Sequence, residues 1–195
     1  MNRREVAELH YISPFANIPL ITRNGILCHE KSKNLKAETI ALPEVQGIRS
    51  NKLVPGALPL HRYANLYFDA RNPMMYKRQT HKLGVIRVNP EVLEIPKVVI
   101  ADGNAASGYT AFYPSPDGLQ HIDKGMVFLD NWNDPNPFQK LINARVKCAE
   151  ALIPNKVDPK YIDGVYVVSN EHKKELQGMG VEISIEVNKH IFFKS

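Results

Sequence analysis

Cysteine is scarce in this sequence of 195 residues, which contains only Cys28 and Cys148. The two cysteines form neither a CxxC motif nor a Cys/His ligand spacing, and the seven histidines are scattered. This pattern indicates neither a zinc site nor a disulfide framework. We therefore expect a protein that needs no metal.

Long apolar runs are also missing. No stretch approaches the roughly 20 residues of a membrane-spanning helix, and the first residues contain no hydrophobic segment of a signal peptide. These absences predict a cytoplasmic protein that does not bind membranes.

The common nucleotide and hydrolase motifs are absent as well. The sequence has no GxxxxGK[ST], GxGxxG, HExxH or GxSxG pattern, which argues against a P-loop NTPase, a Rossmann dehydrogenase, a zincin and an α/β-hydrolase. A bound nucleotide would have to be held by scattered side chains.

What is present is typical of a globular protein, with 44% hydrophobic and 23% charged residues. The length predicts one domain over residues 1–195. Helices are expected from Ser13 or Pro14 to Asn24, around Met74 and over 138–142, with long loops at 29–62 and 102–125. Short strands are predicted at 8–12, 26–27, 64–70, 83–88, 97–101, 150–153, 164–168 and 181–187. Many short strands with few short helices indicate an α+β fold with mostly antiparallel sheets.

Acidic residues are missing from residues 70–90, although the formal net charge of the chain is only +5. This segment has five cations, namely Arg71, Lys77, Arg78, Lys82 and Arg87. Such a block is either a solvated face or a surface that contacts phosphates. Aromatic neighbours such as Tyr67 and Tyr76 favour contact with phosphates and bases.

One carboxylate lies in an apolar setting. Residues 143–154 alternate or run apolar, as an inner strand does, yet Glu150 lies between two alanines and precedes Leu152 and Ile153. It is either an ordinary solvated glutamate or a reactive group. Arg145 and Lys147, just before it, would then face a polyanion.

Several segments together resemble one known family, the DarT family of DNA ADP-ribosyltransferases, which are toxins of DarTG toxin–antitoxin systems. Residues 63–78 are the most specific part of the resemblance, which covers roughly residues 8–170. The segments occur in the same order and at similar spacing as in that family, and they are 8–19, 24–27, 63–78, 101–107 and 147–154.

The resemblance implies an ADP-ribosyltransferase-like fold and the transfer of one ADP-ribose from NAD to a nucleobase of single-stranded DNA. NAD would be consumed as a substrate, and the implied partner is a macrodomain antitoxin of the DarG type. The target base is left open between guanine and thymine, although the form of residues 65–73 is more similar to the guanine-modifying branch.

The family's catalytic residues correspond here to Glu150 and Arg49, although Arg23 and Arg62 compete with Arg49. The implied contacts to NAD are His10, Ser13 and Asn17, with Tyr67 and Met74 on the nicotinamide side. Taken alone, a histidine such as His10 beside apolar strand residues is more often a hydrogen-bonded core histidine than a ligand contact. DNA would approach Lys77, Arg78, Arg145 and Lys147.

These residue types suit the implied chemistry. Cleavage of a bond from ribose to a ring nitrogen resembles glycoside cleavage, and a carboxylate stabilises its oxocarbenium-like transition state. An arginine supplies fixed charge for a pyrophosphate. Two other functions fit the same sequence: an ADP-ribosyltransferase that modifies RNA or protein, and a catalytically silent nucleic-acid-binding module.

Overall fold

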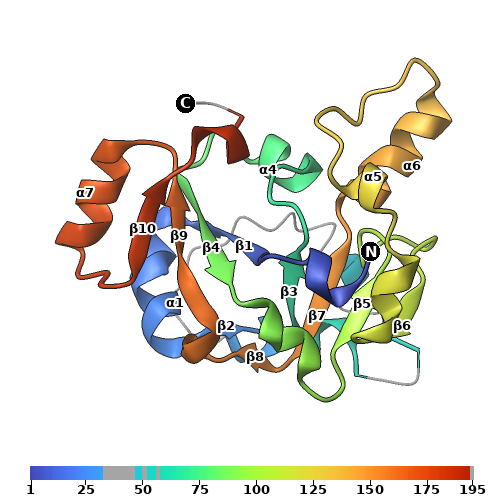
Figure 1. Cartoon of the computed structure of the whole chain (residues 1–195), viewed down its shortest axis with the longest axis horizontal. Helices are drawn as coiled ribbons and strands as arrows, with labels where there is room; N and C mark the ends of the chain where they lie inside the picture. Colours follow the sequence, from blue (N-terminus) through green and yellow to red (C-terminus); the bar gives the residue numbers. More distant parts are fainter. Residues whose placement is uncertain (33–46, 50–51, 56–57, 194–195) are drawn as a thin grey trace.

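The computed structural model describes residues 1–32, 47–49, 52–55 and 58–193. Its centre is an eight-stranded sheet in the order β10-β9-β4-β1-β3-β7-β5-β6 (Figure 1). The strands are β1 (Leu9–Pro14), β3 (Tyr63–Tyr67), β4 (Leu83–Val88), β5 (Val99–Ala101), β6 (Phe112–Pro114), β7 (Glu150–Pro154), β9 (Ile162–Val167) and β10 (Ser184–Val187). A separate antiparallel pair joins β2 (Ile26–Leu27) to β8 (Lys156–Val157).

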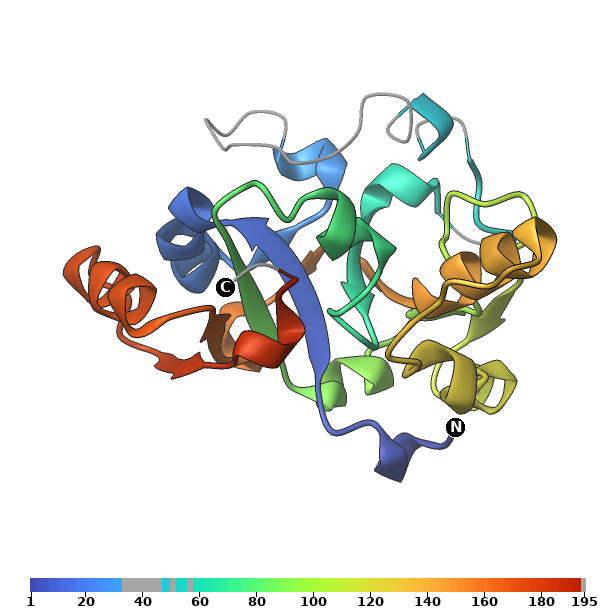
Figure 2. The same ribbon diagram turned by 90° about the horizontal axis from the view of Figure 1, so that it is seen from above.

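Every pair of neighbours in the large sheet is antiparallel except β9 and β10, which run parallel. The prediction of an α+β fold with a mostly antiparallel sheet is therefore confirmed. Seen from above, β1 runs through the middle of the molecule, between β4 and β3 (Figure 2).

The helices are short and lie around the sheet. The α-helices are α1 (Ile18–Asn24), α2 (His29–Ser32), α4 (Pro73–Lys77), α5 (Lys124–Val127), α6 (Pro137–Lys147) and α7 (Asn170–Gly178). The 3-10 turns are η1 (Arg3–Glu5), η2 (Phe15–Asn17), η3 (Leu60–Arg62), η4 (Pro90–Glu94), η5 (Asp117–His121), η6 (Pro159–Tyr161) and η7 (Lys189–Ile191). In Figures 1 and 2, α7 lies at the β10 end of the sheet, and α5 and α6 lie at the opposite end. Within the described ranges, no helix has the length and apolar character needed to cross a membrane.

Local sequence signals explain where several helices begin and end. Asn72 caps α4, since its side-chain oxygen accepts hydrogen bonds from the backbone of Met74 and Met75, and Pro73 occupies the first turn. Gly25 ends α1 at a φ of 85°. A Cβ there would lie 2.1 Å from the carbonyl oxygen of Val157, so both the backbone conformation and the space require glycine.

The two faces of the sheet differ. One face carries the largest hydrophobic cluster, which includes Leu66, Ile86 and Ile153. The other face carries two smaller clusters, one around Tyr67 and Cys148 and one that contains Tyr63, Val99 and Leu152. Strand alternation puts Glu150 on this second face, two residues before Leu152.

Some predicted elements were wrong. Residues 143–147 belong to α6 and not to a strand, and the region 102–125 contains β6, η5 and α5 as well as loops. Helix α7 was not predicted at all. Much of the long loop expected at 29–62 lies outside the described residues, although 47–49 are described and helical.

Candidate active site

The strand register brings three of the predicted site residues into one row across the sheet. His10 on β1 pairs with Tyr67 on β3, and Tyr67 pairs with Glu150 on β7. Directly opposed residues of antiparallel strands put their side chains on the same face, with Cβ atoms roughly 5 Å apart. The three side chains therefore lie side by side on the second face of the sheet.

Glu150 is the first residue of β7, and its side chain is only 1% exposed. Its Oε2 accepts from both terminal nitrogens of Arg49, each at 3.4 Å. Its Oε1 accepts from the backbone N–H of Ala105 at 3.1 Å. These distances exceed the roughly 2.8 Å of a strong charge-assisted hydrogen bond. The carboxylate is thus buried and paired, and its hydrogen bonds to the described residues are long.

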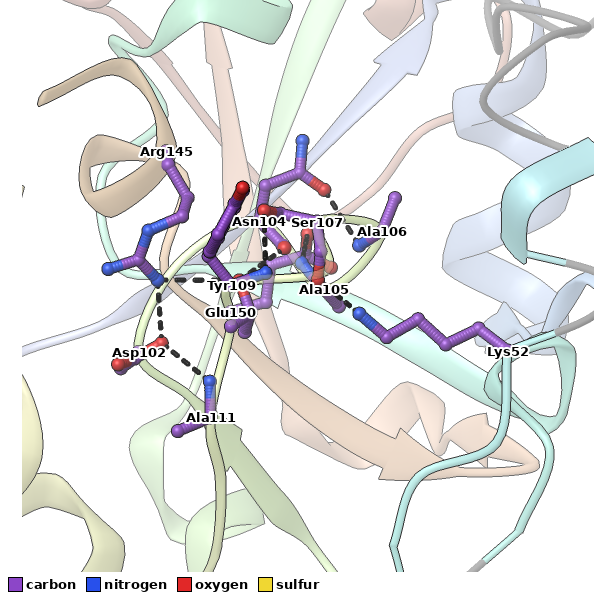
Figure 3. A network of polar contacts seen from close by, with 11 residues as sticks. Lys52, Asp102, Asn104, Ala105, Ala106, Ser107, Tyr109, Ala111, Arg145 and Glu150 are labelled. Atoms are coloured by element: carbon purple, nitrogen blue, oxygen red, sulfur yellow. Dashed lines mark hydrogen bonds and ion pairs between the residues drawn. The ribbon is translucent and has the colours of Figure 1, made fainter. Parts of the chain in front are cut away.

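The loop of residues 102–111 supplies the Ala105 N–H and is fixed at its start and near its middle (Figure 3). On one side Arg145 donates to Asp102 at 2.8 Å, and on the other Lys52 donates to the carbonyl of Ser107. A Cβ on Gly103 would lie 2.6 Å from the Arg145 guanidinium, so the close approach of loop and helix depends on glycine.

His10 is held from its other side by a second polar network. Its Nε2 lies 3.0 Å from Oε1 of Glu8. Tyr166 donates to the same oxygen at 2.9 Å, and Nε of Arg87 donates to the other oxygen at 2.9 Å. His10 Nδ1 is buried and has no hydrogen-bond partner among the described residues. Most buried polar atoms do have a partner, so this atom is an exception next to the candidate site.

The electrostatics of the site favour neutral forms of the groups beside Glu150. Burial, with the Glu150 charge adding to it, raises the pKa of Tyr67 well above its ordinary value. The same two causes raise the pKa of the Cys148 thiol to about 12. Burial and then the Arg49 charge lower the pKa of Lys52. Tyr67 is therefore a neutral hydrogen-bonding group, and Cys148 is an unreactive thiol near neutral pH.

Arg49 is the arginine that contacts Glu150. The two competing arginines lie elsewhere. Arg62 pairs with Glu30 at 3.3 Å, and Arg23 is exposed on the last turn of α1. Met74 packs with the cluster that contains Tyr67.

Two predicted NAD contacts lie further from this row. Ser13 is three residues beyond His10 on β1, which corresponds to roughly 10 Å along a strand. It is buried, and its hydroxyl donates to the Pro14 carbonyl. Asn17 is also buried, in the 3-10 turn that follows. The row itself contains neither residue.

Two of the four predicted DNA contacts are not on an open surface. Lys147 is 1% exposed and donates to Asp69 and to the carbonyl of Val127. Arg145 forms an ion pair with Asp102 at 2.8 Å. The burial of Lys147 follows from the helix, because Asn143, Val146 and Lys147 form the inward side of the last turns of α6. Lys147 as an exposed DNA contact is thus contradicted by its burial.

The other two DNA contacts are accessible. Lys77 is exposed at the end of α4, and Arg78 is half-buried beside it.

Sequence reasoning missed three contributors: the Ala105 N–H, Lys52 and Glu8. Ala105 was missed because a backbone donor leaves no residue-type signal. Glu8 could have been found, because it precedes His10 by two residues and strand alternation places both on one face. In the described part of the chain, no group of three or more His, Cys, Asp or Glu residues is arranged to hold a metal ion.

Comparison with known proteins gives one family. Residues 10–193 match the family described as "ssDNA thymidine ADP-ribosyltransferase, DarT". A curated relative from Thermosipho africanus (strain H17ap60334), a DNA ADP-ribosyl transferase-DNA ADP-ribosyl glycohydrolase fusion protein, is 28% identical over 179 residues. That match covers 87% of this chain and 45% of the relative, so the chain spans about half the length of the fusion protein.

The fold is also that of solved structures. Thermus sp. 2.9 DarT in complex with ADP-ribosylated ssDNA superposes with a TM-score of 0.85 at 19% identity, covering 99% of both chains. The same Thermus protein in complex with NAD+ gives a TM-score of 0.80 at 18% identity, covering 97% of this chain and 98% of that one.

Proposed function

Because this chain belongs to the DarT family, we propose that it is an NAD-dependent mono-ADP-ribosyltransferase that modifies a nucleobase in single-stranded DNA. The observation that carries the proposal is the buried pair of Glu150 and Arg49, in line with His10 and Tyr67. A base inside a duplex is shielded by stacking, which favours a single-stranded substrate. The whole of 1–195 would act as one domain, in the cytoplasm, where NAD and DNA are both present.

Two features support the binding of NAD. Arg49 places both terminal nitrogens on a single carboxylate oxygen at 3.4 Å, and a guanidinium has further N–H groups that would take a pyrophosphate oxygen. His10 offers a buried Nδ1 with no partner among the described residues. Ser13, further along β1, and Asn17, in the 3-10 turn that follows, would also contact NAD. Tyr67 and Met74 would line its nicotinamide side.

NAD supplies the ADP-ribosyl group through its nicotinamide–ribose bond, whose cleavage passes through an oxocarbenium-like transition state. Glu150 stabilises the positive charge that develops at C1′, and burial strengthens this interaction. The base nitrogen bonds to C1′ as the bond to nicotinamide breaks, and Glu150 takes the proton that the base gives up. The Ala105 N–H and Arg49 hold the carboxylate in position for both tasks.

Mass spectrometry of oligonucleotides tests this proposal. The protein is incubated with NAD and equal amounts of single-stranded DNA, the same sequence as RNA, the corresponding duplex and a protein mixture. We expect an added ADP-ribose on single-stranded DNA, with none for Glu150→Gln. Modification of RNA or protein alone would identify the alternative transferase, and no consumption of NAD would identify a silent module.

The target base is read in the same experiment. The family description names thymidine, whereas the form of residues 65–73 is more similar to the guanine-modifying branch. Oligonucleotides in which thymine or guanine is the only candidate base separate the two, and the family description predicts modification of the thymine-only strand.

Lys77 and Arg78 are proposed to hold the DNA backbone. The double variant Lys77→Glu/Arg78→Glu should bind single-stranded DNA at least 10-fold more weakly and with a shallower salt dependence. Lys173→Glu/Lys174→Glu is the matched control, because it makes the same charge change on α7, at the β10 end of the sheet. Equal loss in both variants would mean that net charge alone binds the DNA.

We also propose that the chain is the toxin of a toxin–antitoxin pair and that its partner is a macrodomain antitoxin of the DarG type. The Thermosipho relative, whose name joins a transferase to a glycohydrolase, supports this pairing. Expression of the chain should inhibit growth, and Glu150→Gln should relieve the inhibition. Growth that is equally slow with the variant would contradict the proposal.

A further inference from the structure

Three aromatic rings from separate segments meet beside α4. They are Tyr76 on α4, Trp132 in the segment between α5 and α6, and Phe193 after η7. The ring centroids lie 6.0 Å apart for Tyr76 and Trp132, 5.2 Å for Tyr76 and Phe193, and 5.7 Å for Trp132 and Phe193. All three pairs are edge-to-face, a preferred aromatic geometry. We call Tyr76, Trp132 and Phe193 the aromatic platform.

The platform is accessible and lies among cations. Tyr76 is 51% exposed, and Trp132 and Phe193 are partly exposed. The Arg71 guanidinium lies 4.2 Å from the centre of the Phe193 ring and donates to two carbonyls of the same segment, which fixes the ring in place. Lys77 and Arg78 follow Tyr76 directly, in a segment of 21 residues (70–90) without an acidic side chain.

The platform is continuous with the candidate active site. Phe193 packs on the cluster that contains Met75, Tyr67 and Cys148. The Lys77 charge is close enough to lower the pKa of the Cys148 thiol slightly against the stronger effects of burial and Glu150. Cys148 precedes Glu150 by two residues, so the platform lies at the edge of the same site.

We propose that the aromatic platform stacks a base of single-stranded DNA that neighbours the target nucleotide, while Lys77 and Arg78 pair with its phosphates. This inference rests on the proposed function and names a contact outside the reacting groups. Exposed rings interleaved with cations are the usual means of binding single strands without reading their sequence. The alternative occupant of the platform is a protein partner with an acidic surface, and the experiment below distinguishes it from DNA.

Trp132 gives a direct readout because it is the only tryptophan in the chain. The Glu150→Gln protein is titrated without NAD with an oligothymidylate strand and with an abasic strand of equal length and charge. Stacking predicts that the oligothymidylate quenches Trp132 fluorescence strongly and that the abasic strand does not. Equal quenching by the two strands, or binding by anisotropy without quenching, would overturn the inference. Equal quenching by poly-glutamate would indicate an acidic protein partner instead.

Variants of Tyr76 give the energetic test. Tyr76→Ala should weaken binding of the oligothymidylate by roughly 5- to 100-fold and leave binding of the abasic strand unchanged. Tyr76→Phe keeps the ring and should bind as the parent does. Trp132→Leu, measured by anisotropy, is the second variant in case Tyr76→Ala unfolds. If both Tyr76→Ala and Trp132→Leu bind the oligothymidylate as the parent does, the proposal that the aromatic platform stacks a DNA base is contradicted.

The outcomes separate this inference from the proposed function. If NAD-dependent modification of DNA occurs but Trp132 is not quenched, the platform is wrong and the function stands. If the oligothymidylate quenches Trp132 but no DNA is ever modified, the platform stands and the transferase is wrong.

Discussion

Glu8 and Glu150 are two ion-paired glutamates on the second face of the sheet, and they differ in hydrogen bonding and in exposure. Glu8 accepts three hydrogen bonds of 2.9–3.0 Å, from His10, Arg87 and Tyr166, and its side chain is 23% exposed. Glu150 is almost fully buried but has two contacts of 3.4 Å to Arg49 and one of 3.1 Å to a backbone N–H. Within the part of the chain that the structure describes, the more deeply buried carboxylate is therefore the one with the longer hydrogen bonds.

This difference separates a structural carboxylate from a candidate reactive one. Burial opposes ionisation of Glu8, but hydrogen bonds from His10 and Arg87 overcome it and lower the pKa of Glu8 to about 2. A buried charge with few short bonds costs stability, and sites of this kind are common where a substrate completes the bonding. We expect Glu8 to matter for stability and Glu150 for activity.

The largest effect should come from Glu150→Gln. It keeps the size of the side chain and one acceptor but removes the charge, so we expect transfer to single-stranded DNA to fall by at least about 1000-fold. The free energy of unfolding should change by less than about 1 kcal/mol, because the lost bonds are long. Single-turnover assays and urea denaturation measure the two quantities. Retained activity would remove Glu150 from the mechanism.

Glu8→Gln should give the opposite result. The low pKa of Glu8 in the folded state corresponds to a stabilisation of at most about 3 kcal/mol. This contribution is fully present above pH 4.5 and is lost as the pH falls through 2, because protonation then removes the charge in both states. Urea denaturation of parent and variant should differ most near pH 7 and converge at low pH. A difference in the free energy of unfolding that does not change with pH would contradict the link between the ionisation of Glu8 and stability.

Arg49→Lys tests the cation of the candidate site. Lysine keeps the charge but loses the planar fork, so activity should fall roughly 10- to 100-fold. The matched control is Arg87→Lys, the same exchange at Glu8, which should lower the free energy of unfolding and affect transfer less. Similar losses of activity in both variants would mean that the two pairs do not differ in role.

Tyr67→Phe should have the smallest effect. Because burial and the Glu150 charge raise the pKa of Tyr67, its phenol stays neutral through the physiological range and contributes hydrogen bonds without a charge. We expect activity to fall less than about 10-fold. The pH–rate profile of the parent should show no inflection from Tyr67 up to pH 10, and such an inflection that disappears in the variant would refute this assignment.

Much of the fold was readable from the sequence, because local signals were strong. The strand at 83–88 was predicted at its observed bounds, and the helix predicted around Met74 is α4. The order of strands was not readable, since β1 lies between β4 and β3 and its partners are set by packing over long sequence distances. Helix α7 was missed although Ser169 is a good N-cap and its side chain accepts from His172.

The candidate site was partly readable. Glu150 and Arg49 are 101 residues apart, and only the resemblance to a family suggested that they meet. Their contact is present, and their catalytic roles are predictions. Lys147 was misjudged because residues 143–147 were interpreted with the period of a strand. With the helical period, its spacing from Asn143 predicts an inward position.

The strand order has a consequence for synthesis of the chain on the ribosome. Strand β7 lies between β3 and β5, both of which are made earlier. Until residues 150–154 leave the ribosome, β3 and β5 have no strand to join them, and the Arg49 guanidinium has no carboxylate to meet. A nascent chain can therefore pair β1 with β3 and β4 early, but it joins β3 to β5 and acquires its candidate catalytic pair in one late step, so the proposed transfer cannot precede the synthesis of β7.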